Sequence, residues 1–474
     1  MKFITIIYLL ISYSLLVLSN DVNNELCTVY VSKYGAWNNK DCTNQYPCLT
    51  IGQAIQTCNN QNKGNNINVL VQPGVYMITW SDRLPLYNAN LQFTGIGSGV
   101  IFDLTYQAEP YWITIKDPEN IQKSSSSNSN ITTTVTLKNI EFTTIDHGIV
   151  LANSTTSIVS LTISQCKFNF STIQQGISMF NLQSTNNQIV NIQQTLFNSL
   201  VLASNGYLLS APNAEVVIQN SIFTNISGCL AVVQWNGGSV SFPQTTFQNN
   251  FCPCLLVSKT QGTLNSGSFI GSQSLYSIGV NQNSNLQLNS MNISNNIIVS
   301  LLSINDSSTV QMSNSFISYN TGQIFEVNGS TLELDNITMT NNYKFQLANC
   351  QSSVIKMNNI ITANNIIPII GNMSCSHCDL DNNENWTCPN PNDQPSSSSS
   401  YSYTAELTKD RNTLIIVMSS FVIVILISIV AFNIYCYRKN NQSHSSNTTS
   451  LSSTPTPSLT SLEKTPLLQS DQEA

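Results

Sequence analysis

The stretch Ile218-Gln-Asn-Ser-Ile-Phe223 shows the pattern that decides the fold: an apolar first residue, a polar third residue and an apolar sixth residue. The pattern occurs ten times, and successive copies start 22 to 29 residues apart. Periods of this length are typical of solenoid repeats. The copies are Leu137 to Phe142, Ile163 to Phe168, Ile192 to Phe197, Ile218 to Phe223, Phe242 to Phe247, Leu264 to Phe269, Leu288 to Ile293, Met312 to Ile317, Leu334 to Met339 and, more weakly, Met357 to Thr362.

The polar third residue of each copy predicts a tight turn that stacks on the turn of the next coil. Asparagine tolerates left-handed backbone torsions, and its amide can hydrogen-bond to the same position one coil away. A second alternating apolar segment, such as Cys229-Leu-Ala-Val-Val233, predicts further strands, so we expect about three short strands and no helix per repeat. The third residues are Asn139, Gln165, Gln194, Asn220, Gln244, Ser266, Ser290, Asn314, Asn336 and Asn359.

Two other architectures explain this pattern less well. A leucine-rich repeat would show several fixed leucines, whereas the anchors here are Phe, Ile or Met. A β-sandwich accounts for alternating strands but not for a polar residue at one phase through ten copies. The repeats therefore predict an all-β parallel β-helix solenoid of about ten coils over residues 86–372, with Phe197 and Phe223 in its interior.

The segment before the repeats predicts a cap over the first strand edge, which a solenoid must protect from edge-to-edge association. Residues 27–32, 47–58 and 67–76 read as a strand, an amphipathic helix, and a strand followed by a turn. We assign residues 20–85 to a disulfide-rich amino-terminal α/β cap.

This order of motifs, followed by Leu91-Gln-Phe-Thr-Gly-Ile-Gly-Ser-Gly-Val-Ile-Phe102, resembles the cap and first coil of the pectin-lyase-like right-handed β-helix family. The resemblance covers residues 27–103 by motif and 135–365 by repeat alone. It implies a right-handed coil. It does not imply an activity, because the family includes lyases, hydrolases, adhesins and proteins with no known reaction.

The two ends predict a single-pass type I membrane protein. Lys2 and the apolar run that follows it are typical of a signal peptide, residues 1–19. Residues 413–437 are uncharged and long enough for a transmembrane helix, and Arg438 and Lys439 favour a cytosolic carboxyl end. We expect residues 373–412 to form a Cys-containing cap and a Pro/Ser-rich stalk, and residues 438–474 a disordered cytosolic tail.

Cysteine usage agrees with an oxidising compartment. Twelve cysteines, from Cys27 to Cys388, precede the predicted membrane span and are expected to form disulfides, while Cys436 lies at the inner membrane face. For Cys252-Pro-Cys254, structural bonding is favoured over a redox role.

A zinc site is the alternative for the last cysteines, Cys375, Cys378 and Cys388, together with His377. Their spacing is poor for zinc and the compartment is oxidising, so we expect disulfides, no metal and no cofactor.

Ten Asn-x-Ser/Thr sequons in the predicted ectodomain indicate a glycoprotein, although several would arise by chance in a chain so rich in these residues. The asparagines are Asn130, Asn153, Asn169, Asn225, Asn292, Asn305, Asn328, Asn336, Asn372 and Asn385.

The charge pattern excludes a nucleic-acid partner and disfavours catalysis. Only 9% of residues are charged and the net charge is −7, so the chain lacks the basic patch that binding to nucleic acid requires. The resemblance implies calcium and an arginine base in the lyases and clustered aspartates in the hydrolases, but no arginine lies between Arg83 and Arg411 and the acids are scattered. Glu333 and Asp335 alone are close enough for glycosidic chemistry.

The acids have a simpler explanation as exposed ladders. Glu333 has the same phase as Lys356 one coil later, and Glu141 the same phase as Lys167, so each pair predicts a surface ion pair. Asp146-His147 is read as an exposed turn rather than as a catalytic pair.

The tail contains Glu463-Lys-Thr-Pro-Leu467-Leu468, which resembles an acidic dileucine sorting signal and implies a clathrin adaptor as partner. Together these features favour a non-enzymatic surface or endolysosomal glycoprotein whose rod serves adhesion or binds a glycan or protein. The alternatives are a carbohydrate-active enzyme, a polysaccharide lyase or glycoside hydrolase that uses Asp146, His147 or the Glu333/Asp335 pair, and a structural lumenal coat protein.

Overall fold

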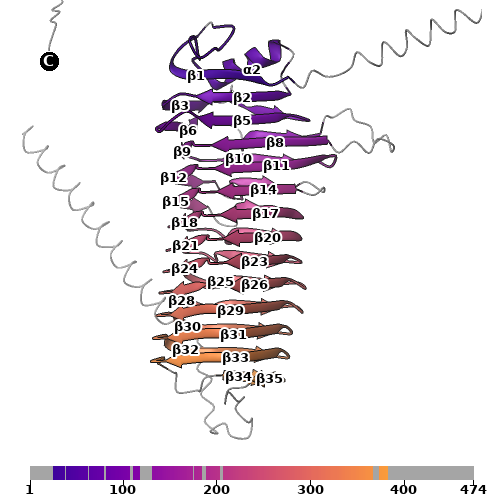
Figure 1. Ribbon diagram of the computed structural model, residues 1–474, viewed down its shortest axis with the longest axis vertical. Helices are drawn as coiled ribbons and strands as arrows, with labels where there is room; N and C mark the ends of the chain where they lie inside the picture. Colours follow the sequence, from indigo (N-terminus) through magenta and orange to yellow (C-terminus); the bar gives the residue numbers. More distant parts are fainter. Residues whose placement is uncertain are drawn as a thin grey trace, which may run out of the picture. The chain divides into compact units, whose positions relative to one another are not determined.

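The computed structural model describes residues 25–37, 39–61, 63, 65–79, 82–106, 110–117, 131–174, 176–183, 188–202, 206–366 and 373–382. Its strands stack into a column of coils, with the amino-terminal end at the top of Figure 1. Neighbouring strands pair in parallel, as successive coils of a solenoid require. The parallel β-solenoid predicted from the repeat is confirmed.

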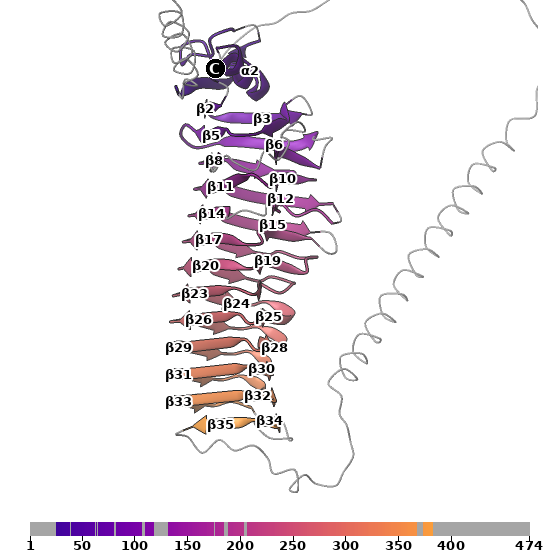
Figure 2. The ribbon, with the colours of Figure 1, turned by 90° about the vertical axis from the view of Figure 1, so that its right-hand side faces the viewer.

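Each coil contributes a strand to each of three stacks, which we call the long ladder, the short ladder and the second sheet (Figure 2). The long ladder consists of β1 Cys27–Ala36, β2 Asn66–Val71, β5 Asn90–Gly95, β8 Ile131–Lys138, β11 Ser157–Ser164, β14 Gln188–Gln193, β17 Ala214–Gln219, β20 Gly238–Pro243, β23 Gln261–Asn265, β26 Asn285–Asn289, β29 Thr309–Ser318, β31 Thr331–Thr340, β33 Val354–Ala363 and β35 Asp379–Asn382. The short ladder consists of β3 Gly74–Thr79, β6 Val100–Tyr106, β9 Glu141–Thr143, β12 Lys167–Ile173, β15 Leu196–Leu202, β18 Ile222–Thr224, β21 Thr246–Gln248, β24 Ser268–Ile270 and β27 Asn292–Ser294, and the second halves of β29, β31 and β33 continue it. The second sheet consists of β4 Leu84–Leu86, β7 Tyr111–Lys116, β10 Gly148–Asn153, β13 Phe180–Leu182, β16 Tyr207–Ser210, β19 Ala231–Asn236, β22 Leu255–Ser258, β25 Gln273–Asn281, β28 Ile297–Asn305, β30 Thr321–Asn328, β32 Tyr343–Gln351 and β34 Met373–Ser376.

The coil number predicted from the repeat is too low. The second sheet has 12 strands in the described part of the chain, which corresponds to about twelve coils rather than ten. The six-residue pattern is absent where glycine, instead of a polar residue, makes the turn of an early coil. Gly97 and Gly99, between β5 and β6, have φ values of +83° and +82°. The last strands, β34 and β35, lack the pattern as well.

The sixth residue of the repeat fills the core, as predicted. Six phenylalanines stack face to face along the short ladder, with successive ring centroids 4.8 to 5.0 Å apart. This spacing is that of neighbouring strands. Ile293, Ile317 and Met339 continue the buried row, but Thr362 of the weak tenth copy is exposed. The stacked rings are Phe142, Phe168, Phe197, Phe223, Phe247 and Phe269.

The polar third residue makes the turn between the long and short ladders, also as predicted. All ten of these residues have φ values between +48° and +56°. Some bond to the same position of the next coil: Asn359 Nδ2 donates to Asn336 Oδ1 at 3.0 Å, and Asn336 Nδ2 donates to Asn314 Oδ1 at 2.7 Å. A small or amide side chain suits this left-handed corner because it avoids the clash of a bulky residue.

A second asparagine row, which the repeat pattern did not predict, lies buried in the corner between the short ladder and the second sheet. Asn296, Asn320 and Asn342 are fully buried, and Nδ2 of each donates to Oδ1 of the next asparagine, at 2.8 Å and 3.1 Å for the first two links. The residue before each has positive φ and turns the chain. Pairs such as Asn295-Asn296 and Asn341-Asn342 are the sequence signal for this corner.

The amino-terminal cap has the predicted order of strand, helix and strand. Helix α2, Ile51–Asn60, begins at Thr50, whose side chain accepts a hydrogen bond from the backbone N–H of Gln53. Disulfide Cys27–Cys58 ties the helix to β1, and Cys42–Cys48 closes the loop between them. The helix lies at the end of the column in Figure 1, where it covers the first coil.

The expectation that all twelve cysteines pair is wrong for Cys166 and Cys254, which are free and buried. Burial raises the pKa of Cys166 to about 12 and that of Cys254 to about 11, so both stay protonated. Cys166 Sγ donates to the Leu137 carbonyl at 3.4 Å, so the thiol works as a small polar residue in a corner. The remaining described disulfides are Cys229–Cys252 and Cys350–Cys378, and Cys375 is disulfide-bonded too.

The membrane assignment concerns residues outside the described part. Among the described residues, no helix is long and apolar enough to cross a membrane. The signal peptide 1–19, the span 413–437 and the tail 438–474 lie outside that part, as does most of the stalk segment 373–412.

Candidate functional site

A groove of about 570 Å³ lies on the outward face of the long ladder, near its carboxyl-terminal end. Residues i and i+2 of each strand stand on this face, while the residue between them points into the core. Two parallel rows of side chains therefore form the walls, and the backbone of the buried residues between them forms the floor. This terminal groove is lined by Gln287, Asn289, Gln311, Ser313, Glu333, Asp335, Lys356, Asn358 and Asp381, over Met312, Leu334 and Met357.

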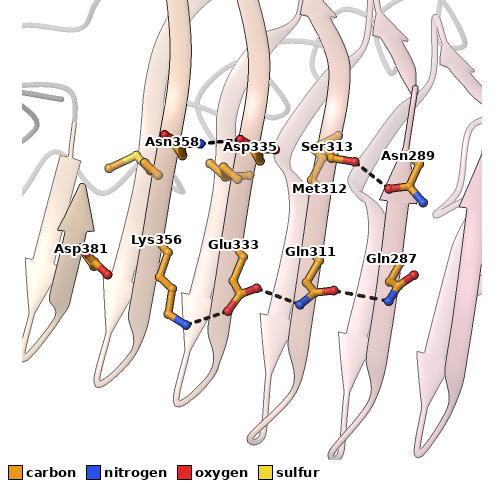
Figure 3. Close-up of a pocket in the computed structure, with 12 residues that line it drawn as sticks. Gln287, Asn289, Gln311, Met312, Ser313, Glu333, Asp335, Lys356, Asn358 and Asp381 are labelled. Atoms are coloured by element: carbon orange, nitrogen blue, oxygen red, sulfur yellow. Dashed lines mark hydrogen bonds and ion pairs between the residues drawn. The ribbon is translucent and has the colours of Figure 1, made fainter. Parts of the chain in front are cut away.

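The first wall is a hydrogen-bonded chain of side chains, drawn in Figure 3. Gln287 Nε2 donates to Gln311 Oε1 at 3.4 Å, and Gln311 Nε2 donates to Glu333 Oε2 at 2.8 Å. Lys356 Nζ donates to Glu333 Oε1 at 2.8 Å from the next coil. The hydrogen-bonded chain thus spans four coils, and Asp381, in register with Lys356, continues the row into a fifth. The Glu333–Lys356 ladder predicted from the repeat is confirmed.

The second wall stands two residues further along each strand. Ser313 Oγ donates to Asn289 Oδ1 at 2.7 Å, and Asn358 Nδ2 donates to Asp335 Oδ1 at 2.7 Å (Figure 3). Asn289 Nδ2 in turn donates to Asn265 Oδ1 at 3.0 Å, which extends the wall beyond the groove. Both walls thus hold their amide and carboxylate groups in fixed orientations, with the remaining donors and acceptors facing solvent.

The electrostatics of the terminal groove are acidic. Glu333, Asp335 and Asp381 oppose a single ammonium group, that of Lys356. The hydrogen bond from Lys356 is the largest cause that lowers the pKa of Glu333, and it outweighs the opposite effect of burial. The same contact raises the pKa of Lys356. Glu333 is therefore held as a carboxylate at neutral pH.

The structure brings Glu333 and Asp335 together on β31, where they face the same groove, and adds Asp381, which sequence analysis missed. Asp381 has the phase of Lys356 one coil later, so continuation of the repeat spacing would have found it. The other predicted ladder is in register, but among the described residues Glu141 accepts from Asn169 Nδ2 at 3.0 Å and forms no ion pair with Lys167.

Asp146 and His147 lie in a corner between β9 and β10, in a different coil from the terminal groove. The prediction of an exposed turn is wrong about exposure, because both side chains are half-buried. The Asp146 carbonyl accepts from the Gln174 backbone N–H at 3.0 Å, which makes the corner part of the solenoid framework. The cause is packing: the next coil stacks directly on this turn.

Two of the three cysteines considered as alternative zinc ligands are occupied by disulfides. Cys378 bonds to Cys350 of the preceding coil, and Cys375 is disulfide-bonded. His377 Nδ1 lies 3.2 Å from Ser376 Oγ. Cys388 lies outside the described residues, as does the sorting motif Glu463, Leu467 and Leu468.

Seven of the ten sequon asparagines are described, and each is exposed or half-buried, which suits a modification site. They are Asn153, Asn169, Asn225, Asn292, Asn305, Asn328 and Asn336, whereas Asn130, Asn372 and Asn385 lie outside the described residues.

No protein-family model matches the chain, and no curated protein does. Solved structures do resemble it. A mannuronan C-5 epimerase A-module from Azotobacter vinelandii is 10% identical, with 70% of this chain and 94% of that chain covered and a TM-score of 0.28. A rhamnogalacturonan lyase is 11% identical, with 75% and 87% covered and a TM-score of 0.24. An Acinetobacter phage tailspike protein is 10% identical with a TM-score of 0.25, and this chain covers 55% of its length. Such likeness concerns the fold and assigns no activity.

Proposed function

We propose that this chain is a non-enzymatic, membrane-anchored β-solenoid that binds a neutral or amino-bearing glycan in the terminal groove. The observation that carries the proposal is the pair of polar walls, which present amides, hydroxyls and carboxylates in register over five coils. Sugar hydroxyls both donate and accept hydrogen bonds, so such walls complement a saccharide. Ligand sites fix orientation with a few well-placed polar groups, as these walls provide.

The groove charge favours some glycans over others. Three carboxylates against one ammonium group repel an anionic polyuronate and tolerate a neutral or cationic sugar chain. The lowered pKa of Glu333 suits a hydrogen-bond acceptor and argues against Glu333 as the general acid of a glycosidase, because that group needs a raised pKa so that it stays protonated.

Binding is tested with the secreted ectodomain on cello-oligosaccharides, chitosan oligosaccharides and polygalacturonate. We expect saturable binding to one of the first two probes and none to polygalacturonate. Replacing Gln311 and Asn358 with Ala removes two hydrogen-bonding groups from the walls. At about 0.5–1.5 kcal/mol for each bond, the dissociation constant should rise about tenfold.

The matched control replaces Gln234 and Asn349, which stand on the outward face of the second sheet, with Ala. This double variant should bind like the parent in calorimetric titrations. Equal loss in both double variants, or binding of polygalacturonate alone, would contradict the assignment of the groove.

A carbohydrate-active enzyme is the second candidate, and one observation favours it: Glu333 and Asp335 share the groove on adjacent outward positions of β31. Outward neighbours on a strand stand about 6.5 Å apart, which is within the range of carboxylate pairs in inverting glycosidases. A shortened or modified saccharide would distinguish this candidate from a binding protein.

For location we propose the type I arrangement, with the dileucine motif directing the protein to endosomal or lysosomal membranes. Its support is the sequence of residues 413–474. Changing Leu467 and Leu468 to Ala removes two apolar anchors from a small interface, where such anchors carry most of the binding energy. The variant should accumulate at the plasma membrane by surface biotinylation. A parent protein already confined to the surface, with an identically distributed variant, argues against the motif.

A further inference from the structure

The described sequon asparagines avoid one face of the column. Three of them lie on the second sheet, in β10, β28 and β30, and three lie on or directly after short-ladder strands, at β12, β18 and β27. The seventh, Asn336, is at the corner of β31 with φ of +54°. The outward face of the long ladder, between its two corners, carries none of the seven. The second-sheet set is Asn153, Asn305 and Asn328, and the short-ladder set is Asn169, Asn225 and Asn292.

This face does not lack asparagine. Eight asparagines occupy its outward positions, and the residue two positions after each of them is neither Ser nor Thr. In Asn90-Leu-Gln92, Asn191-Ile-Gln193 and Asn285-Leu-Gln287 a glutamine takes that place. One substitution in each would complete a sequon. The eight are Asn66, Asn68, Asn90, Asn191, Asn265, Asn285, Asn289 and Asn358.

The same face carries a row of mostly polar residues parallel to the column axis. Strand pairing places successive residues of this row in register from β1 to β35. All of its members before Glu333 are uncharged, and Val217 alone among them is apolar. The row is Thr28, Asn68, Gln92, Thr136, Thr162, Asn191, Val217, Ser241, Thr263, Gln287, Gln311, Glu333, Lys356 and Asp381.

We infer that the whole outward face of the long ladder, which we call the bare face, is kept free of N-glycans and binds an extended neutral polysaccharide along the column axis. The inference rests on the proposed function and extends the ligand from the terminal groove to the full length of the solenoid. A repeating polymer meets an amide or hydroxyl group of this row at every coil before Glu333, except at Val217. A protein partner would instead need apolar or aromatic anchors, which this polar row does not offer.

The test attaches a glycan at three heights on the bare face. Gln92→Thr, Gln193→Thr and Gln287→Thr create sequons at Asn90, Asn191 and Asn285, near the first coils, in the middle and at the terminal groove. Gln→Val at each position is the matched control, since valine is β-branched like threonine but completes no sequon. Gln183→Thr creates a sequon at Asn181 on the second sheet and controls for an added glycan elsewhere. Mass spectrometry establishes occupancy.

With cello-oligosaccharides of increasing length as probes, we expect affinity to rise with chain length, because each further coil adds contacts at high effective concentration. Each of the three bare-face glycans should weaken long-chain binding at least tenfold, whereas Gln183→Thr should leave it unchanged. The valine variants lose a single amide each and should weaken it only about threefold. At a position that stays unglycosylated, Gln→Ala should still lower long-chain affinity.

Loss at Gln287→Thr alone, with normal binding by the occupied Asn90 and Asn191 variants, would overturn the inference and leave the terminal groove as the site. A parent ectodomain that binds no saccharide, or that binds peptides alone, overturns the proposed function together with the inference.

Discussion

Replacing Phe223 with Asp should abolish folding of the ectodomain. The ring is fully buried and stacks on Phe197 at 4.8 Å and on Phe247 at 4.9 Å. Loss of the ring alone costs about 3–5 kcal/mol, and an unpaired buried carboxylate adds several more. The sum is comparable to the whole stability of an ordinary domain. Because each coil contacts only its neighbours, a gap in one coil interrupts the column.

The control for this prediction is the preceding residue. Ile222 is 42% exposed on the opposite side of the same strand, so Ile222→Asp should be secreted and melt like the parent. Secretion yield and thermal unfolding followed by circular dichroism provide the comparison. Normal secretion and an unchanged melting temperature for Phe223→Asp would mean that the register described here is wrong.

The second large effect is expected at Asn320, in the buried asparagine row. Its Oδ1 accepts from the backbone N–H of Asn296 at 3.0 Å and from Asn296 Nδ2 at 2.8 Å, and its Nδ2 donates to the Ile293 carbonyl at 3.0 Å. Leucine is similar in size but leaves these buried partners unsatisfied. At about 1–3 kcal/mol for each orphaned group, Asn320→Leu should lower the free energy of unfolding by about 2–6 kcal/mol.

Asn285→Leu is the matched control, because Asn285 is exposed on a strand of the same column. A surface substitution of this kind should change stability by less than about 0.5 kcal/mol. Urea unfolding of the two variants measures the difference. Equal stability of both would show that the asparagine row contributes no more than apolar filling would.

The six-residue repeat and the order of elements in the amino-terminal cap could be predicted from the sequence, whereas the early glycine turns and the buried asparagine row could not. The polar third residue and the sixth-residue anchor recur, so period and side-chain chemistry together assign positive φ to Asn139 and burial to Phe223. The earliest turns could not be predicted in this way, because Gly97 and Gly99 adopt positive φ without a polar side chain. Counting by motif therefore underestimates the coils.

Local chemistry explains the other differences. An even number of cysteines suggested complete pairing, but a solenoid interior accepts a protonated thiol as a corner residue, as at Cys166. The buried asparagines were hidden because Asn295-Asn296 looks like any polar turn, and only the backbone decides which of the two points inward. The acid pair on β31 was visible in the sequence. The groove was not, since it depends on side chains from five coils.

Chain-length analysis of the bound saccharide after prolonged incubation with the ectodomain tests the central claim most directly. The account predicts saturable binding with the saccharide recovered unchanged in length and free of new unsaturated ends. Glu333, held ionised by Lys356 and Gln311, then serves as a hydrogen-bond acceptor for the ligand. Shortened or unsaturated products that disappear in a Glu333→Gln/Asp335→Asn variant, with binding preserved, would contradict it and establish an enzyme.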